Sequence, residues 1–377
     1  MECLEKPIWS SYTREELTKF MIKAPDEDIR RKVLSNFDHV AKPIEGLGKF
    51  EVLIAQIGAI QGTEKIDISQ KAVIIMCADN GIVEEGISQS GQEVTLAVVK
   101  NMAEKKSSVG RMAAIAKADT IPVDIGINCK DSLPGVLNKK ISLGTRNFRN
   151  EAAMTEEEVM KAVFTGIEMV FECKRKGYNI LATGEMGIGN TTTSSAVAAA
   201  LLHCEVTEVT GRGAGLSDEK LIHKKNIIAE AIDKYGLKDA DAFSILESVG
   251  GLDIAGLAGV CIGGALYHVP IVLDGVISMA AALLAERIVP GTKGYLIPSH
   301  KGREPAAERL SKELGLEPVI DGDMALGEGT GAVMMFPLLD MALSVYQDRT
   351  TFADILIEQY ERFGSSSEHP CGQGAYT

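Results

Sequence analysis

Two glutamates of this sequence lie in glycine-rich segments, where their side chains could do acid–base chemistry. Glu185 lies in the segment LATGEMGIGNTTTSS at residues 181–195, and Glu328 has a glycine on either side. A carboxylate with glycine neighbours is sterically accessible, which suits a general base. The alternative for each is an acid that caps the N-terminus of a helix. Both follow predicted strands, and ligands of open parallel sheets bind beyond the carboxyl ends of the strands, so the pair indicates an active site.

The segment that contains Glu185 is also suited to bind a phosphate group. Its glycines precede a run of asparagine and threonine that begins an alanine-rich helix. Glycine lets the backbone approach a ligand closely, and a helix N-terminus offers free N–H groups and the positive end of its dipole. The alternative is a tight turn between a strand and a helix with a favourable N-cap.

A second glycine-rich segment, TGRGAGLSD at residues 210–218, precedes a helix that carries Lys224 and Lys225. Its glycine pattern is a weak match to a dinucleotide fingerprint, because no clear strand precedes it. Lys224 is a candidate contact for a nucleotide monophosphate. The alternative is a turn followed by solvated lysines.

The composition narrows the function further. The chain has 377 residues, 45% of them hydrophobic and 5% aromatic, and a net charge of −13. The negative net charge and the few aromatic residues argue against nucleic acid as a partner. Surfaces that bind nucleic acid need clustered lysine and arginine or stacking aromatics. The seven cysteines form no CxxC pair, the six histidines form no HxxxH pattern, and no secretory signal or membrane-length apolar run is present. We therefore expect a cytoplasmic protein with reduced thiols, no metal site and no membrane partner.

Short apolar runs alternate with longer helical patterns from residue 71 onward. This alternation predicts parallel strands joined by crossover helices, with both faces of the sheet covered. We expect an α/β fold, namely a doubly wound (Rossmann-like), mostly parallel sheet of about six strands. The expected strands are 72–77, 120–125, 179–182, 271–273, 295–297 and, more weakly, 318–320. The expected helices include 95–116, 156–174, 193–203 and 276–287.

The two ends of the chain predict a separate, small helical domain. Residues 1–70 contain three helical patterns and no strand, and residues 336–364 are helical in pattern and are expected to pack back against them. The helical patterns lie at 13–21, 26–39, 49–61 and 336–363. The Rossmann-like catalytic domain is then expected at 71–335, and a flexible tail at 365–377.

Signatures of several other enzyme classes are absent. The sequence has no P-loop, no GxSxG nucleophile elbow and no HExxH motif. It also lacks a strand that ends in two adjacent acids, which is typical of transferases that use a diphosphate–Mg²⁺ ribosyl donor. The strand at 271–273 runs into one acid, Asp274, which we expect to cap the helix that follows.

Segments along nearly the whole chain resemble, in the same order, the nicotinate-nucleotide–dimethylbenzimidazole phosphoribosyltransferases of cobamide biosynthesis. GEMGIGNTT at 184–192 and LGEGTG at 326–331 are the longest and most unusual of these segments. The others are KPIEGLGKFE at 42–51, ADNG at 78–81, QEVT at 92–95, GRGAGL at 211–216, VGGLDIA at 249–255 and DGVIS at 274–278.

The resemblance implies transfer of ribosyl 5-phosphate from nicotinate mononucleotide to a lower-ligand base such as 5,6-dimethylbenzimidazole. The products would be an α-ribazole 5′-phosphate and nicotinate, with inversion at the anomeric carbon. The resemblance also implies a homodimer that uses neither cofactor nor metal, because the pyridinium charge of the departing nicotinate lets it leave unaided.

Roles for individual residues follow from the same resemblance. Glu328 would be the general base that removes the azole proton, and Glu185 would balance positive charge that develops on the ribose. Contacts to the base would come from Ser88, Gln92 and Met186. Contacts to the phosphate and nucleotide would come from Gly187, Gly189, Asn190, Thr191, Gly211, Gly213, Gly215, Lys224 and Arg303.

The chain departs from the family pattern at several of these segments. Asn80 replaces a histidine, Ser90 and Gly91 replace an aromatic–proline pair, and Gly302 replaces a serine associated with phosphate contact, for which Arg303 is the candidate substitute. Loss of the aromatic residue reshapes the base pocket. Alternatives to the preferred function are therefore a relative that acts on phenols or purines, and a base-binding paralogue without catalysis. A dinucleotide-binding oxidoreductase is disfavoured, because the first strand runs into ADNGIVEE rather than a glycine-rich loop.

Overall fold

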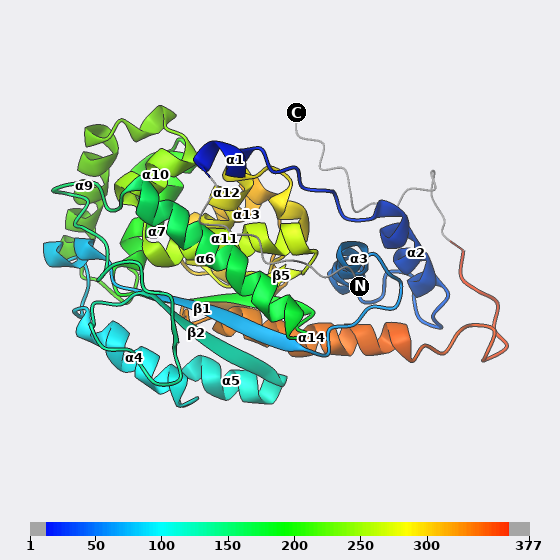
Figure 1. The fold of residues 1–377 in the computed structure, drawn as a ribbon. Coiled ribbons are helices and arrows are strands. Elements are labelled where there is room, and N and C mark those ends of the chain that lie inside the picture. The colour runs from blue at the N-terminus through cyan, green and yellow to red at the C-terminus, as the bar shows by residue number, and fades with distance from the viewer. Residues whose placement is uncertain (1–12, 362–377) are drawn as a thin grey trace. The chain divides into compact units, whose positions relative to one another are not determined.

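The computed structural model describes residues 13–361, which form two compact units (Figure 1). The larger unit contains residues 13–24 and 68–336, and the smaller unit contains residues 25–67 and 337–361.

A six-stranded parallel sheet lies at the centre of the larger unit, which confirms the predicted doubly wound α/β fold. The strand order in the described residues is β3-β2-β1-β4-β5-β6, so the direction of winding reverses between β1 and β4. Ligands of such sheets bind beyond the carboxyl ends of the strands at this switch point. The strands are β1 (Lys71–Ala78), β2 (Ala118–Gly126), β3 (Leu137–Asn138), β4 (Ile180–Met186), β5 (Ile271–Val272) and β6 (Leu296–Ile297).

The central strand β1 is buried along its whole length, because helices cover both of its faces. Helix α4 contacts β1, β2 and β4, and helix α11 contacts the same strands from the opposite side (Figure 1). The helices that follow the strands in this unit are α4 (Glu93–Ala103), α5 (Ser108–Ala116), α6 (Glu156–Arg175), α7 (Asn190–Leu201), α8 (Val206–Val209), α9 (Asp218–Lys234), α10 (Ala242–Val249), α11 (Leu252–Tyr267), α12 (Val276–Ile288) and α13 (Ala306–Leu314). Short 3₁₀ turns lie at η2 (Gly81–Glu85), η3 (Leu237–Asp239) and η4 (Thr292–Tyr295).

Helices α6 and α11 pack backbone to backbone where glycines meet. A Cβ atom on Gly166 of α6 would lie 2.0 Å from the carbonyl oxygen of Gly256, and one on Gly259 of α11 would lie 1.9 Å from the carbonyl oxygen of Val163. Neither position has room for a side chain. The apolar, glycine-rich sequence of α11 is therefore explained by close helix packing on the sheet.

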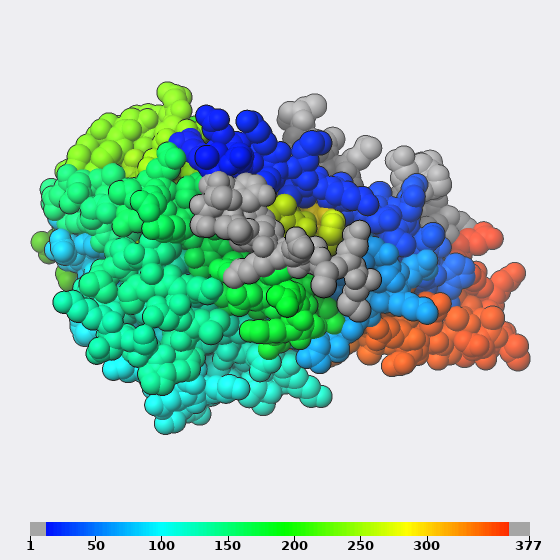
Figure 2. Space-filling view, in the orientation of Figure 1, coloured from blue at the N-terminus to red at the C-terminus, as the bar shows by residue number. Residues whose placement is uncertain are grey.

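A long connection, residues 127–155, joins β2 to α6 and includes the short edge strand β3. It forms much of the face that Figure 2 shows, in green to teal. Its backbone packs tightly on η2, since a Cβ atom on Gly81 would lie 2.5 Å from the carbonyl oxygen of Thr145. This contact holds the loop that follows β1 close to the sheet.

The helix expected at 95–116 is two helices, α4 and α5, which corrects that prediction. Lys105 between them has a left-handed backbone, with φ of 56°. The side chain of Ser107 then accepts a hydrogen bond from the amide of Gly110 and caps α5. The polar run EKKSS at 104–108 marks this break in the sequence, and the prediction of one helix overlooked it.

A second, two-stranded parallel sheet follows the main one. It pairs β7 (His300–Gly302) with β8 (Ile320–Met324). The weakly predicted strand at 318–320 therefore lies next to and partly within β8, outside the six-stranded sheet.

The smaller unit contains α2 (Glu27–Asp38) and α3 (Lys49–Gln61), which pack against each other, and the end of α14 (Thr330–Gln347). The side chain of Asp26 accepts hydrogen bonds from the amides of Asp28 and Ile29 and starts α2. The helix expected at 336–363 needs correction at both ends, because α14 begins at Thr330 and residues 348–361 are not helical. The tail at 365–377 lies outside the described residues.

Residues 13–24 belong to the larger unit, which corrects the expectation that the first 70 residues form part of one helical domain. They contain α1 (Arg14–Thr18). Arg14 pairs with Asp241 at 2.5 Å and lies 4.6 Å from the centre of the Phe243 ring. Among the described residues, no helix has the length and apolar character to cross a membrane.

Candidate active site

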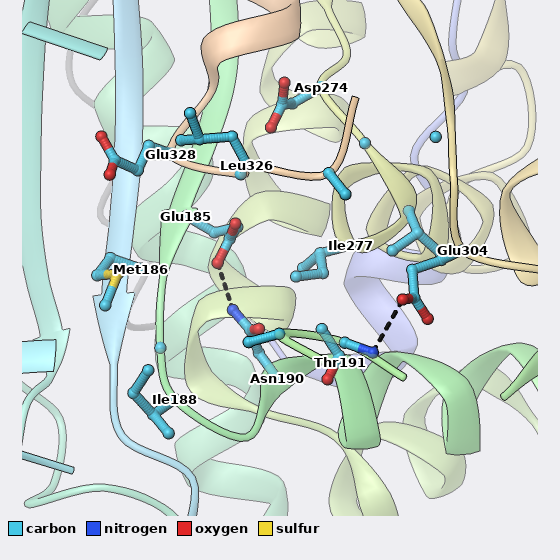
Figure 3. A pocket seen from close by; sticks show the side chains of 18 of the residues that line it. Glu185, Met186, Ile188, Asn190, Thr191, Asp274, Ile277, Glu304, Leu326 and Glu328 are labelled. Atoms are coloured by element: carbon cyan, nitrogen blue, oxygen red, sulfur yellow. Dashed lines mark hydrogen bonds between the residues drawn. The ribbon is translucent and has the colours of Figure 1, made fainter. Parts of the chain in front are cut away.

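A cavity of about 290 Å³ opens beyond the carboxyl ends of the central strands, on the side where β1 and β4 are neighbours (Figure 3). Its walls come from the loops after β1, β4 and β5, from the loop between α8 and α9, and from the segments around β7 and β8. The topology thus brings to one place six segments that are far apart in the sequence. The polar side chains of the lining are Ser88, Gln89, Glu185, Asn190, Thr191, Arg212, Asp274, Ser278, His300, Arg303, Glu304 and Glu328.

Glu185, at the end of β4, lies at the floor of the cavity and is 7% exposed. Its carboxyl group accepts hydrogen bonds from the side-chain amide of Asn190, drawn in Figure 3, and from the backbone amide of Glu328. Burial disfavours the charged form and raises the pKa of Glu185 to about 8, and the charges of Asp253 and Asp274 act in the same direction. Near pH 7, the unliganded site therefore holds Glu185 mostly in its neutral form.

Glu328 also lines the cavity, in the loop between β8 and α14. Its backbone is left-handed, with φ of 61°, and Gly184 makes room for it, since a Cβ atom there would lie 2.7 Å from the Glu328 carbonyl oxygen. Its carboxylate Oε2 accepts a hydrogen bond of 3.0 Å from the amide of Val109, in the first turn of α5. In Figure 3 the carboxyl group accordingly points away from Glu185.

The wall opposite Glu328 offers backbone amides from two glycine-rich segments. Gly187, Gly189, Thr191 and Gly213 all line the cavity. Gly189 has φ of 97° and precedes the first turn of α7, which has no side-chain cap. One amide of this wall is already engaged, because the amide of Gly213 donates a hydrogen bond of 2.9 Å to Oε1 of Glu304. Figure 3 draws a dashed line at the carboxylate of Glu304.

Lys224 does not line the cavity but supports this wall from behind. Its ammonium group is fully buried and donates to Oγ1 of Thr191 at 3.1 Å and to the carbonyl oxygen of Gly211 at 3.3 Å. A Cβ atom on Gly211 would lie 2.1 Å from Oε2 of Glu304 and 2.7 Å from Cδ of Pro305, so a side chain there would displace Glu304. Lys224 therefore acts on the predicted phosphate wall through Thr191 and Gly211.

The buried ammonium group of Lys224 makes stability depend on pH. Burial lowers the pKa of Lys224 from 10.5 to about 8. Between these values the unfolded chain binds more protons than the folded chain, so the free energy of unfolding rises with pH. We expect wild type to gain about 2 kcal/mol relative to Lys224→Met between pH 7.5 and pH 10, measured by urea unfolding of both proteins at each pH. A difference that stays constant over this range would contradict the burial of the charge.

The side chain of Asn190, predicted to contact the nucleotide, is engaged by two carboxyl groups. Its Nδ2 donates to Glu185 and, at 3.1 Å, to Oδ2 of Asp253. Asn190 is 5% exposed. Its part in the site is therefore to hold these two acids.

The residues predicted to contact the base are only partly brought together. Ser88 and Met186 line the cavity, but Gln92 does not. The amide of Gln92 donates to the carbonyl oxygen of Asn80 at 3.3 Å and accepts from Asn128 at 3.0 Å. Gly215 also lies outside the lining, where its carbonyl oxygen accepts from Gln89, whereas Arg303 lines the cavity and is exposed.

Asp274 does not cap the helix that follows it, which corrects the sequence prediction. Helix α12 begins after Gly275 without a side-chain cap. The carboxylate of Asp274 instead accepts from the amides of Gly329, Gly331 and Ala332, at 3.2, 2.8 and 3.2 Å, and so caps α14. Burial raises the pKa of Asp274.

Sequence reasoning missed six polar residues of the lining and one acid behind it: Gln89, Arg212, Asp274, Ser278, His300 and Glu304, with Asp253 behind them. Several of their contacts are long-range, such as Glu304 with Gly213 and Asp274 with the start of α14. The available signal for most of them was their position in the segments GRGAGL, VGGLDIA and DGVIS, which carry the family resemblance, or close to Gly302, where the chain departs from it.

The parallel sheet and the acid-lined cavity at its switch point define an α/β enzyme with a small-molecule site. A family model described as phosphoribosyltransferase matches residues 22–357. The nicotinate-nucleotide–dimethylbenzimidazole phosphoribosyltransferase of Clostridium acetobutylicum is 44% identical over 90% of this chain and 97% of its own length. The enzyme of that name from Ruminiclostridium cellulolyticum is 41% identical over the same shares.

A solved structure leads to the same family. The crystal structure of CobT from Thermus thermophilus superposes with a TM-score of 0.84 and 34% sequence identity, and covers 88% of this chain and all of its own. The chain belongs to the nicotinate-nucleotide–dimethylbenzimidazole phosphoribosyltransferase family.

Proposed function

We propose that this enzyme transfers ribosyl 5-phosphate from nicotinate mononucleotide to the ring nitrogen of a benzimidazole-type base. The products are an α-ribazole 5′-phosphate and nicotinate, with inversion at C1′. Family membership supports the reaction. The observation that carries it is that Glu185 and Glu328, from separate loops, line one cavity that is faced by glycine amides able to bind phosphate.

Each acid has a distinct task in this reaction. Glu328 accepts the N–H proton of the attacking azole, so that the ring nitrogen can form its bond to C1′. Glu185, at the floor of the cavity, lies near the sugar and balances the positive charge that develops as the bond to nicotinate breaks. The pyridinium nitrogen takes the electron pair of that bond, and nicotinate leaves as a neutral ring with its carboxylate. The side chain of Glu328 must turn from the amide of Val109 toward the base for this step.

The phosphate group of the donor is assigned to the wall formed by Gly187, Gly189 and Thr191, with Lys224 behind it. The amide of Gly213 can join this wall only when Glu304 releases it. Arg303, exposed at the cavity, supplies the positive charge near the position where Gly302 lacks a hydroxyl group. Gly211 supports this wall without contacting the phosphate. Asn190 acts in the same indirect way, because it holds Glu185. Of the residues predicted for the base, Ser88 and Met186 are the proposed contacts.

Release of nicotinate tests the proposal. Purified protein is incubated with nicotinate mononucleotide and 5,6-dimethylbenzimidazole, and nicotinate and the α-ribazole 5′-phosphate are followed by liquid chromatography with mass detection. The function predicts formation of both products in equal amounts. Nicotinate without the ribazole would indicate hydrolysis, and neither product would support a base-binding paralogue without catalysis.

The base pocket is expected to discriminate only modestly between bases. Ser90 and Gly91 stand where the family pattern has an aromatic residue and a proline, and a lost apolar contact of this size changes specificity about 10–200-fold. Equimolar 5,6-dimethylbenzimidazole, benzimidazole, adenine and p-cresol should therefore give more than one product in competition. A single dimethylbenzimidazole product above about 99% would contradict the open pocket.

We further propose that the enzyme works as a homodimer in the cytoplasm. Exposed apolar side chains close to the site, Leu326 at 54% and Met334 at 39%, support association with a second copy. Sedimentation velocity would show twice the chain mass of 40.3 kDa. The described cysteines are all free thiols, as in a reducing compartment.

A further inference from the structure

Three carboxyl groups gather at the floor of the cavity without a lysine or arginine to neutralise them. Glu185, Asp253 and Asp274 are 7%, 0% and 3% exposed. In the described part of the chain, no lysine or arginine forms an ion pair with any of them. Asp274 is stabilised by three amides of the α14 N-terminus and faces His300, which leaves Glu185 and Asp253 as the least compensated pair.

Asp253, which begins the first turn of α11, reaches Glu185 through one shared amide. Its Oδ2 accepts from Nδ2 of Asn190 at 3.1 Å, and the same nitrogen donates to Glu185. Its Oδ1 accepts from the amide of Ile254 at 3.0 Å. A Cβ atom on Gly187 would lie 2.8 Å from Oδ2, so the backbone after β4 lies directly on Asp253. Because Asp253 can only accept, it forces Asn190 to present its NH₂ group, rather than its oxygen, to Glu185.

We propose that Asp253 is a positioning residue of the transfer reaction, which orients Glu185 through Asn190 and whose charge makes binding of a ribosyl donor with a pyridinium leaving group release a proton from Glu185. This inference rests on the proposed function, because the cation is the pyridinium ring of nicotinate mononucleotide. In the binding step, the O–H bond of the Glu185 carboxyl group breaks and its proton goes to the buffer. The resulting carboxylate then faces the positive charge of the donor.

The surroundings of Glu185 favour this proton release. The ionisable groups that face it are Asp253 from α11, Asp274 from the loop after β5 and Cys77 from β1, while Glu328 contributes its backbone amide. None of these side chains is a cation, so a bound pyridinium becomes the nearest positive charge. Burial raises the pKa of Asp253 to about 6, so it is mostly charged near pH 7, and its charge adds to the burial that raises the pKa of Glu185 to about 8.

Proton release is measured by isothermal titration of the protein with nicotinate mononucleotide, without acceptor base, at pH 7.0 in two buffers of different ionisation enthalpy. A group with a pKa of 8 is about 90% protonated at pH 7, so wild type should release about 0.9 proton per site more than Glu185→Gln. The comparison with Glu185→Gln removes any contribution from the phosphate of the ligand. In Asp253→Asn the release should fall to about half of the wild-type value. The acidic limb of its kcat/KM profile should shift down by about one pH unit.

The site offers a way to tolerate Asp253→Asn. The Oδ1 atom of Asn80 is buried without a partner, and it lies, like Oδ1 of Asp253, within 2.7 Å of the point that a Cβ atom on Gly251 would occupy. The new amide can therefore donate to Asn80 and still accept from Asn190, in exchange for the hydrogen bond that Oδ1 of Asp253 accepts from Ile254. If this variant does not fold, Asp253→Ser removes the same charge with less volume.

Asp124→Asn is the matched control. Asp124 is also buried, at 2% exposed, but it is neutralised by Lys140 at 2.7 Å. Its proton release should equal that of wild type, since its charge does not act on Glu185. Equal release in wild type, Glu185→Gln and Asp253→Asn, all of which bind the nucleotide, would overturn this inference alone if wild type turns the nucleotide over. Absence of nucleotide binding and turnover in wild type would overturn the proposed function and this inference with it.

Discussion

Glu328→Gln is expected to lower kcat by about 10²–10⁴-fold while the protein stays folded. The amide keeps the size of the side chain and can still accept a hydrogen bond from Val109 through its oxygen. It cannot take the azole proton, so the attacking nitrogen stays a poor nucleophile. The effect should appear in kcat and in kcat/KM alike, because proton removal belongs to the transition state and not to substrate binding. Single-turnover formation of α-ribazole 5′-phosphate measures it.

Asp323→Asn provides the control for this substitution. Asp323 lies five residues away in the same segment, is exposed and does not line the cavity. The same acid-to-amide change there should leave kcat within about twofold of wild type. If Glu328→Gln kept more than about a third of the wild-type kcat, another group would have to be the base.

Gly166→Ala is expected to lower the free energy of unfolding by about 3 kcal/mol. The new Cβ atom would lie 2.0 Å from the carbonyl oxygen of Gly256, so α6 and α11 must move apart by about an ångström. The higher helix propensity of alanine stabilises α6 by only about 1 kcal/mol, which is too little to offset the lost packing. Urea unfolding of both proteins measures the difference.

Thr165→Ala, one residue earlier in α6, is the matched control. Thr165 is partly exposed, and its hydroxyl group donates only to the carbonyl oxygen of Lys161 in the same helix. Its loss should change the free energy of unfolding by less than about 1 kcal/mol. Equal effects of the two substitutions would show that α6 and α11 can move apart at this crossing without a loss of stability.

The sheet could be predicted from the sequence because its strands are short, apolar and bounded by glycine and polar residues. Strand β1 is the clearest case, since burial on both faces requires an unbroken apolar run. The break between α4 and α5 was missed, although the polar run EKKSS at 104–108 and the capping residue Ser107 mark it in the sequence. The edge strand β3 has two residues, both exposed, and leaves no periodic signal.

The active site, like the fold, could be predicted only in part. Glu185 and Glu328 could be found because their glycine neighbours mark them locally. The residues that hydrogen-bond around these glutamates could not be found, because they are distant in the sequence. Asn190 is 63 residues from Asp253, and Val109 is 219 residues from Glu328. The phosphate wall was predicted as direct contact with Lys224, but the fold places that side chain behind Thr191. Burial of a lysine is a property of the packed structure and has no local signature.

The cap that Asp274 places on α14 limits how the loop of Glu328 can respond to a ligand. Three amides on and after Gly329 are tied to the end of β5, so the backbone on the C-terminal side of Glu328 is anchored to the sheet. In the proposed mechanism, the change in Glu328 between its contact with Val109 and the attacking base is then mainly a rotation about side-chain torsions. Rotations of side chains are far faster than the microsecond-to-millisecond lid motions that limit many enzymes. We therefore expect chemistry or product release, and not movement of this loop, to limit turnover.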